Sequence, residues 1–228
     1  IWNTLATAYK YKLLTALTEA SEANFELTYK DVASIGMGDE SSLVRGAAID
    51  LMWEDESPSF MRQLLQIARN DDASEVRARA LVGLGKFILL GEYEEIEESL
   101  AVEAQELAIS FHKDQTQPLE VRRRALEALS NSSHAEKDGL IRNAYHSGEH
   151  LLKVSAVFGM GRTCDEKWQD ILLDELDGSD NEIVYEAVRA CGEIQLSASV
   201  RQLGELILGD DREIQMMAIW SLGEIGGK

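Results

Sequence analysis

The chain has 228 residues, of which 45% are hydrophobic and 28% are charged, and it carries a formal net charge of -19 with only two prolines. This composition provides enough apolar material for a sizeable core and argues against a disordered or linker-rich chain. The acidity opposes a nucleic-acid partner, because phosphate binding needs clustered lysine and arginine. The longest apolar runs, such as FILL at 87–90, are too short to cross a bilayer, so we expect no membrane partner.

The first predicted element is an N-terminal helix over residues 2–20. Tyr9, Leu13, Leu14 and Leu17 match the pattern of the later helices only imperfectly, so we expect this helix to cap the fold. Six helical hairpins follow it in the prediction, and their approximate ranges are 27–54, 57–88, 92–131, 135–162, 166–194 and 198–226.

The second helix of each hairpin carries the clearest pattern. In SEVRARALVGLG at 74–85, with Val76 as position 0, apolar residues stand at 0, +5 and +8, alanine at +4 and glycine at +9. The pattern starts again at residues 44, 121, 152, 183 and 214, each time with alanine at +4. Positions 0, +4, +5 and +8 form one face of an α-helix, and alanine lets a neighbouring backbone approach closely. A hairpin of about 31 residues cannot bury this face alone, whereas a stack of hairpins can.

The spacing between repeats is interrupted once, between residues 76 and 121. We interpret the extra residues as an acidic insertion over about 91–118, whose 92–106 portion has seven glutamates and no basic residue. The expected structure is a lengthened first helix in the third hairpin, with a preceding loop.

The units DESSLVRGAAIDL, DDASEVRARALVGLG and DDREIQMMAIWSLGEIG resemble the short HEAT repeats of the HEAT-like, or phycobilisome-lyase-like, family. The resemblance covers roughly residues 27–226. It implies an all-α, right-handed α-solenoid of about 13 helices, which we expect to form a single domain over residues 1–228. The family includes scaffolds, lyases, hydroxylases and regulators, so the resemblance predicts the fold more sharply than the function.

Charge is unevenly distributed between the helices of each hairpin. The six second-helix windows, from -2 to +10, hold 11 basic and 10 acidic residues, whereas the other 150 residues hold 11 and 31. Arginine recurs at +1 as Arg45, Arg77 and Arg122. One interpretation is structural, with bonds to loop acids such as Asp39 and Asp71 or Asp72. The alternative is a ladder that binds anions.

In the family, the second helices line the concave surface, and helical geometry predicts that positions +2, +3, +6 and +10 point away from the core. Aromatic residues, methionine and arginine at such positions are typical of interfaces. The predicted basic contacts, which would select acidic groups, are Arg79, Arg123, Arg124, Arg162 and Arg189. The predicted apolar anchors are Phe158, Tyr185, Met216, Met217 and Trp220. For Met216, Met217 and Trp220, the alternative is that further repeats cover them.

No catalytic motif is evident. None of the four histidines is followed by glutamate, and His146 and His150 flank Ser147 and Gly148, which indicate a surface turn between helices. GLGK at 83–86 and GMGR at 159–162 lie inside the repeat and lack the context of a phosphate loop. We therefore expect no metal, no cofactor and no enzymatic activity.

The leading functional hypothesis is a scaffold or regulatory adaptor that binds a protein or peptide partner in its concave groove. One alternative, by family resemblance, is a lyase-like or chaperone-like activity on a bilin or similar chromophore. Another is a structural module of a longer protein. Cys164 and Cys191 are the only cysteines, and two cysteines are typical of a reduced, cytoplasmic protein.

Overall fold

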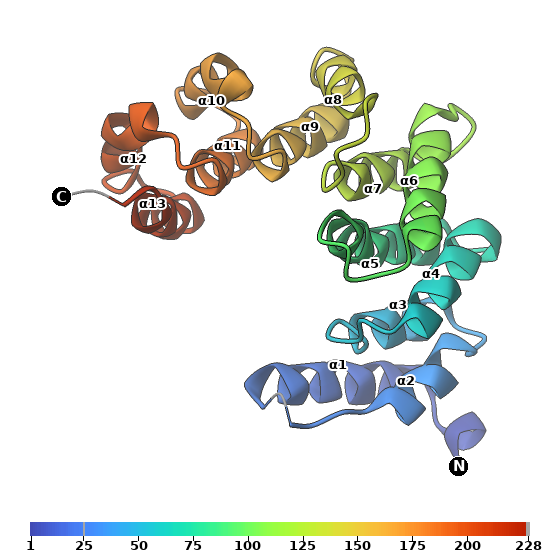
Figure 1. Ribbon diagram of the computed structural model, residues 1–228. Coiled ribbons are helices and arrows are strands. Elements are labelled where there is room, and N and C mark those ends of the chain that lie inside the picture. Colours follow the sequence, from blue (N-terminus) through green and yellow to red (C-terminus); the bar gives the residue numbers. More distant parts are fainter. Residues whose placement is uncertain (25, 227–228) are drawn as a thin grey trace. The chain divides into compact units, whose positions relative to one another are not determined.

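The computed structural model describes residues 1–24 and 26–226. These residues form thirteen α-helices and no strand, which confirms the predicted all-α class (Figure 1). Among the same residues, no helix combines the length and apolar character that a membrane span requires. The helices group into two compact units, residues 1–128 and the residues from Leu129 onward. A single domain over 1–228 stays a prediction.

The first unit contains an N-terminal helix and three hairpins. Its helices are α1 (Thr7–Ala23), α2 (Lys30–Met37), α3 (Ser42–Asp50), α4 (Pro58–Asn70), α5 (Ser74–Glu92), α6 (Glu98–Lys113) and α7 (Leu119–Leu129), the last of which reaches the unit boundary. In Figure 1, α1, α3 and α5 lie in one layer, with α2 and α4 beside them in a second layer.

The N-terminal segment differs from the single helix that was predicted over 2–20. A short 3-10 helix spans Trp2–Thr4, and α1 begins only at Thr7. The backbone between them is extended at Leu5 and Ala6, which interrupts the helix. Leu14 is fully buried where α1 packs on α3. Leu14 is the one buried apolar residue of α1, which explains why the helical pattern looked degenerate.

The acidic insertion is shared between two helices. Helix α5 continues for 19 residues to Glu92, and a turn with Glu94 at a φ of 61° leads into α6, which has 16 residues. Helix α6 is thus longer than α4, which has 13 residues. Its buried side includes Leu100, Ala104 and Leu107.

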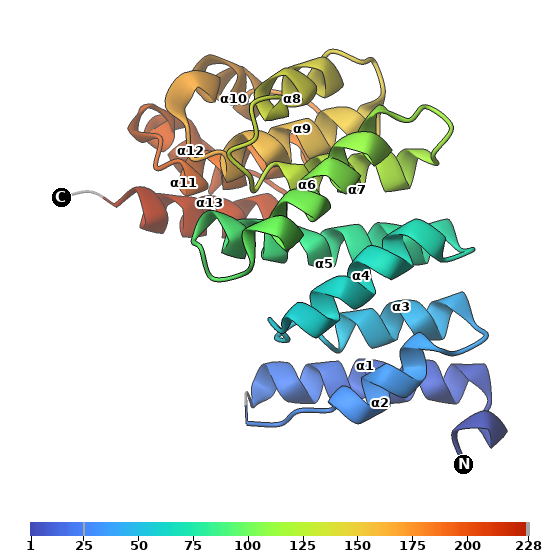
Figure 2. The same ribbon diagram turned by 45° about the vertical axis from the view of Figure 1, so that its right-hand side comes forward.

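The second unit contains three hairpins. Its helices are α8 (Lys137–Tyr145), α9 (His150–Arg162), α10 (Gln169–Leu176), α11 (Asn181–Glu193), α12 (Val200–Leu206) and α13 (Arg212–Ile225). Figure 2 shows α9, α11 and α13 following one another in a row, and α8, α10 and α12 each lie beside the second helix of their own hairpin. Short 3-10 turns at Glu166–Trp168 and Ser197–Ser199 precede α10 and α12.

The repeat pattern predicted the buried core of both units. All six alanines at position +4 have no exposed surface. They are Ala48, Ala80, Ala125, Ala156, Ala187 and Ala218. The apolar residues at position 0 are also buried in every repeat. A larger side chain at +4 would overpack these sites.

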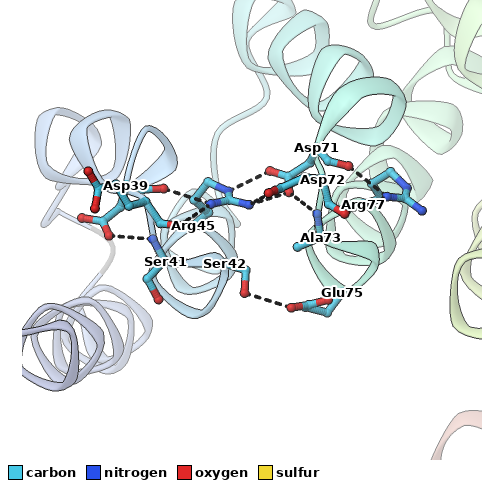
Figure 3. A network of polar contacts seen from close by, with 10 residues as sticks. Asp39, Ser41, Ser42, Arg45, Asp71, Asp72, Ala73, Glu75 and Arg77 are labelled. Carbon is cyan, nitrogen blue, oxygen red and sulfur yellow. Dashed lines mark hydrogen bonds and ion pairs between the residues drawn. The ribbon is translucent and has the colours of Figure 1, made fainter.

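The recurring +1 arginines hold the loops between helices, as the structural interpretation proposed. Arg45 forms a two-pronged bond to the Asp71 carboxylate, at 2.8 Å from Nε and 2.7 Å from Nη2, and a 2.6 Å bond to Asp72 (Figure 3). It also donates to the backbone carbonyls of Asp39 and Glu40. Arg45 thus joins the loop of its own hairpin to the loop of the next hairpin.

The electrostatics of Asp71 agree with this role. Burial alone would raise the pKa of Asp71, but hydrogen bonds from Arg45 and from the Ala73 N–H outweigh it and hold the pKa below its usual range. Arg77 donates in turn to the carbonyl of Asp71 at 2.9 Å, and Arg122 donates to the carbonyl of His112 at 3.3 Å. The arginines are therefore committed to the backbone and loop acids, so the anion-ladder interpretation has no support from these contacts.

Candidate functional site

The open surface of the second helices is narrower than helical geometry predicted. Positions +3, +6 and +10 retain exposed surface in most repeats, but position +2 is buried in the first four. The buried +2 residues are Gly46, Ala78, Arg123 and Val154. The prediction that +2 points away from the core was wrong. A helix inside a stack is flanked by neighbouring repeats as well as by its own first helix, so only one stripe stays open.

A cleft of about 630 Å³ opens on this stripe in the first unit. Helices α3 and α5 supply most of its walls, and α7 contributes to the rim. The lining residues are Ile49, Asp50, Trp53, Phe60, Glu75, Ala78, Arg79, Val82, Gly83, Lys86, Phe87, Glu120 and Arg124. Its volume lies within the range typical of ligand pockets.

Trp53 stands at one wall of the cleft, in the turn that follows α3. It occupies repeat position +9, where four of the six repeats have glycine. Its indole N–H donates to the Ser21 hydroxyl at 3.3 Å, and its carbonyl accepts from the Lys86 ammonium at 2.7 Å. Trp53 nevertheless remains 42% exposed. A large aromatic side chain is thus held in place at the surface by contacts on both sides.

Helix α5 forms the opposite wall and the floor. Val82, at position +6, is 53% exposed, and Phe87 is fully buried below it. Phe60 meets Phe87 edge-on, with ring centroids 6.1 Å apart. Gly83 lets α5 approach α4, because a Cβ at this residue would lie 2.9 Å from the Leu64 side chain. The cleft is therefore a preformed apolar recess.

The basic residues at the rim are paired with acids of the chain itself. Arg79 is bonded to Asp50, and the Lys86 ammonium lies 3.7 Å from Glu56. Arg124 contacts Glu120 at 2.8 Å and Glu127 at 2.7 Å. Burial lowers the pKa of Lys86 from its ordinary value. The rim is thus close to electrically balanced.

Arg123 differs from the prediction most clearly. It is only 8% exposed and lies within 3.5 Å of Glu120 and Glu127, which are one helical turn away on either side of it in α7. Its position at +2 accounts for its burial, as described above. Arg123 is therefore not placed to meet a ligand on the open stripe.

The predicted residues of the second unit form a paired network. The Arg189 guanidinium lies 4.2 Å from the centre of the Phe158 ring, a stacking distance, and contacts Glu186 at 3.0 Å. Arg162 bonds to Glu193 at 3.1 Å and to Asn131 at 3.0 Å. Phe158 is consequently half-covered.

The remaining predicted anchors lie toward the end of the second unit. Tyr185 and Met217 are half-buried, while Met216 and Trp220 are exposed. Tyr185, Met216 and Met217 share a shallow hollow of about 590 Å³ with Arg212 and Glu213. Met216 stands at position +2, the side that faces a neighbouring repeat elsewhere in the chain, so it is separate from the open stripe.

Of the residues that line the cleft, Arg79 and Arg124 were among the predicted site residues, whereas the two exposed apolar ones, Trp53 and Val82, were not. The signal for Val82 was present, because it stands at the outward position +6. Trp53 replaces the glycine of the repeat, and a tryptophan at a close-packing position has to move outward. A search for departures from the repeat pattern would have found it.

Comparisons with known proteins gave matches among solved structures alone. No protein-family model matches the chain, and a search of the curated proteins found no similar sequence. Human deoxyhypusine hydroxylase, in complex with glycerol, is 18% identical with a TM-score of 0.46, and the match covers 98% of this chain and 81% of that one. YibA from E. coli is 15% identical with a TM-score of 0.44, covering 86% and 80%. Both are HEAT-repeat-like, all-helical proteins.

These comparisons correct one expectation. The absence of a catalytic motif led to the prediction that the chain is not an enzyme, yet one of the similar structures belongs to an enzyme. The prediction that the chain is not an enzyme therefore does not stand. At this identity and TM-score the hydroxylase activity itself is not transferred to the chain.

Proposed function

We propose that the chain is a HEAT-like repeat scaffold or adaptor that binds a protein or peptide segment through the cleft of its first unit. The observation that carries the proposal is the exposed pair of Trp53 and Val82 beside a preformed recess of about 630 Å³. Exposed apolar side chains next to a concave, apolar recess are typical of an interaction site. Tryptophan is also among the residue types that dominate binding energy at interfaces.

The charge of the rim argues for an apolar partner segment rather than an acidic one. Arg79, Lys86 and Arg124 each have a carboxylate partner within the chain. An acidic ligand would have to displace these partners, and the net gain from exchanging one carboxylate for another is small. An apolar side chain inserted between Trp53 and Val82 removes apolar surface from water without this exchange.

The proposal is tested by selecting peptides from a displayed random library on the 228-residue protein. Val82→Asp is the test variant, because it places a charge in the wall of the cleft. Val102→Asp is its matched control, since Val102 is 46% exposed on α6 and lies outside the cleft. We expect the selected peptides to lose about tenfold or more in affinity for Val82→Asp, which corresponds to about 1.4 kcal/mol, and to bind Val102→Asp unchanged.

Two results would contradict the proposal. One is that no peptide is enriched; the other is that both aspartate variants bind the enriched peptides as well as the wild type does. Equal far-UV circular dichroism and equal melting of the two variants exclude a folding defect. A change in Trp53 fluorescence on binding, absent in Trp53→Phe, places the peptide in the cleft.

A further inference from the structure

The last helix, α13, exposes a side that the corresponding helices bury. At position +5 the five earlier repeats have buried residues, whereas Ile219 is 51% exposed. At position +2, Met216 is 60% exposed, although the +2 residues of the first four repeats are buried. We call Met216, Ile219 and Gly223 the terminal face. These residues stand at +2, +5 and +9; a Cβ at Gly46, the +2 residue of the first repeat, would lie 2.9 Å from the Arg79 side chain of the following repeat.

Glycine contacts show what normally covers this side. A Cβ at Gly161 would lie 2.8 Å from the Cα of Ala190, and a Cβ at Gly192 would lie 2.8 Å from the Cα of Ser221. Both neighbours stand at position +7 of the next repeat. Gly223 stands at the same position +9 and has no atom within 4 Å of its Cβ site. The close approach for which this glycine is suited is therefore unfilled.

A polar contact that joins neighbouring repeats has no counterpart at the last repeat among the described residues. Position -2 of one repeat bonds to a loop aspartate of the next: His150 contacts Asp180 at 2.8 Å, and Asn181 contacts Asp211 at 2.8 Å. Arg212 is the -2 residue of the last repeat, and it makes no ion pair with any residue that the structure describes. Its guanidinium is suited to a carboxylate in the position that Asp211 occupies for Asn181.

We propose that the terminal face receives one further hairpin of the same repeat pattern. The occupant is specified by three features of the surface. Its loop carries a carboxylate that meets Arg212, its second helix places a small residue at +7 against Gly223, and apolar side chains cover Met216 and Ile219. This inference stands independently of the cleft in the first unit.

The test extends the 228-residue chain with its own last repeat. Residues 1–225 are followed by a second copy of residues 195–226, so that the copied turn and hairpin continue from α13. Hydrogen exchange is then measured on peptides from α13 and from the added hairpin. We expect exchange in α13 to slow by about tenfold and the added hairpin to be protected, because stacked repeats stabilise their neighbours.

The matched control carries Ile219→Asp and Gly223→Arg in α13 and leaves the added copy unchanged. We expect its added hairpin to exchange like an unfolded chain, while the unextended double variant melts like the wild type because both sites are exposed. An unprotected hairpin on the unaltered face would overturn the proposal. Sedimentation equilibrium of the unextended chain is the second decisive measurement: self-association that Ile219→Asp abolishes would make a second copy the occupant and would also overturn it.

Discussion

Two glycines at the same repeat position are expected to respond in opposite ways to alanine. A Cβ at Gly192 would lie 2.7 Å from the Ser221 hydroxyl oxygen and 2.8 Å from its Cα. Overpacking of this kind costs about 1–3 kcal/mol, whereas the higher helix propensity of alanine returns up to about 1 kcal/mol. We therefore expect Gly192→Ala to lower the free energy of unfolding by about 1–2 kcal/mol.

Gly223→Ala is the matched variant, because no atom lies within 4 Å of its Cβ site. The propensity gain is then unopposed, so this variant is expected to stabilise the protein by up to about 1 kcal/mol. For a chain of this length, each kcal/mol corresponds to a shift of about 2–4 °C in the melting temperature. The two melting temperatures should thus move apart in opposite directions.

The assay is thermal and urea unfolding followed by far-UV circular dichroism. Hydrogen exchange in α11 and α13 complements it, because repeat proteins can lose two-state behaviour. Gly161→Ala serves as a second instance of the crowded case, since its Cβ would lie 2.8 Å from the Cα of Ala190. The reasoning would be refuted if Gly192→Ala stabilised the protein as Gly223→Ala does, or if both shifted the unfolding midpoint equally.

Three further predictions concern polar and titratable groups. A double-mutant cycle of Arg45→Met and Asp71→Asn should give a coupling free energy of about 1.5–3 kcal/mol near pH 7. This coupling should disappear as the pH falls through the folded-state pKa of Asp71, which Arg45 holds below its ordinary value. A coupling near zero at pH 7 would contradict the bridging role. Burial holds the pKa of His112 below its ordinary value. Its contribution to stability is therefore complete above about pH 6.5 and is lost as the pH falls from there toward the folded-state pKa. Urea titrations should find this dependence of the unfolding free energy on pH in the wild type and not in His112→Gln. Burial raises the pKa of the Cys191 thiol to about 11, so a thiol reagent at pH 8 should label exposed Cys164 in the native protein and Cys191 only after unfolding; early labelling of Cys191 in mass spectra would show local opening.

The fold was predictable because the repeat places the same residue types at the same helical positions. Ala80 and Ala156 illustrate this, since alanine at +4 is surrounded by the same neighbours in each hairpin. The contacts of Arg45 were predictable for a similar reason: Asp39 and Asp71 each lie five residues before the position-0 valine of their own repeat. A repeat pattern therefore predicts the burial and the contacts that recur in every hairpin.

The open surface was predicted less well, because it depends on contacts between repeats. A helical wheel distinguishes core from solvent but does not include the neighbouring repeat, so Arg123 was assigned to the open side although it is buried. The ion pairs of the arginines could not be predicted from the sequence either. Arg162 and Arg189 looked available to a ligand, yet Glu193 lies within 4 Å of both. Such pairs depend on three-dimensional packing.

The geometry of the cleft constrains the ligand that it can take. Trp53 follows α3 and Val82 lies on α5, and packed helices lie about 8–10 Å apart. In a polyproline II segment, side chains three residues apart lie on the same side at a separation of about 9 Å. In an α-helix, residues seven apart are separated by about 10.5 Å on one face. We therefore expect two apolar anchors in the selected peptides, separated by three or by seven residues.

Alanine scanning of a selected peptide against Trp53→Ala and Val82→Asp tests this spacing. One peptide anchor should lose its contribution to affinity in Trp53→Ala, and a different anchor should lose its contribution in Val82→Asp, because the two walls contact different side chains. If both protein variants coupled to the same peptide residue, the ligand would fill the cleft with one side chain instead of bridging two helices. Anchors two residues apart in a strand, at about 7 Å, or four residues apart in a helix, at about 6 Å, would likewise contradict the bridging geometry, because neither spacing reaches 8 Å on one face.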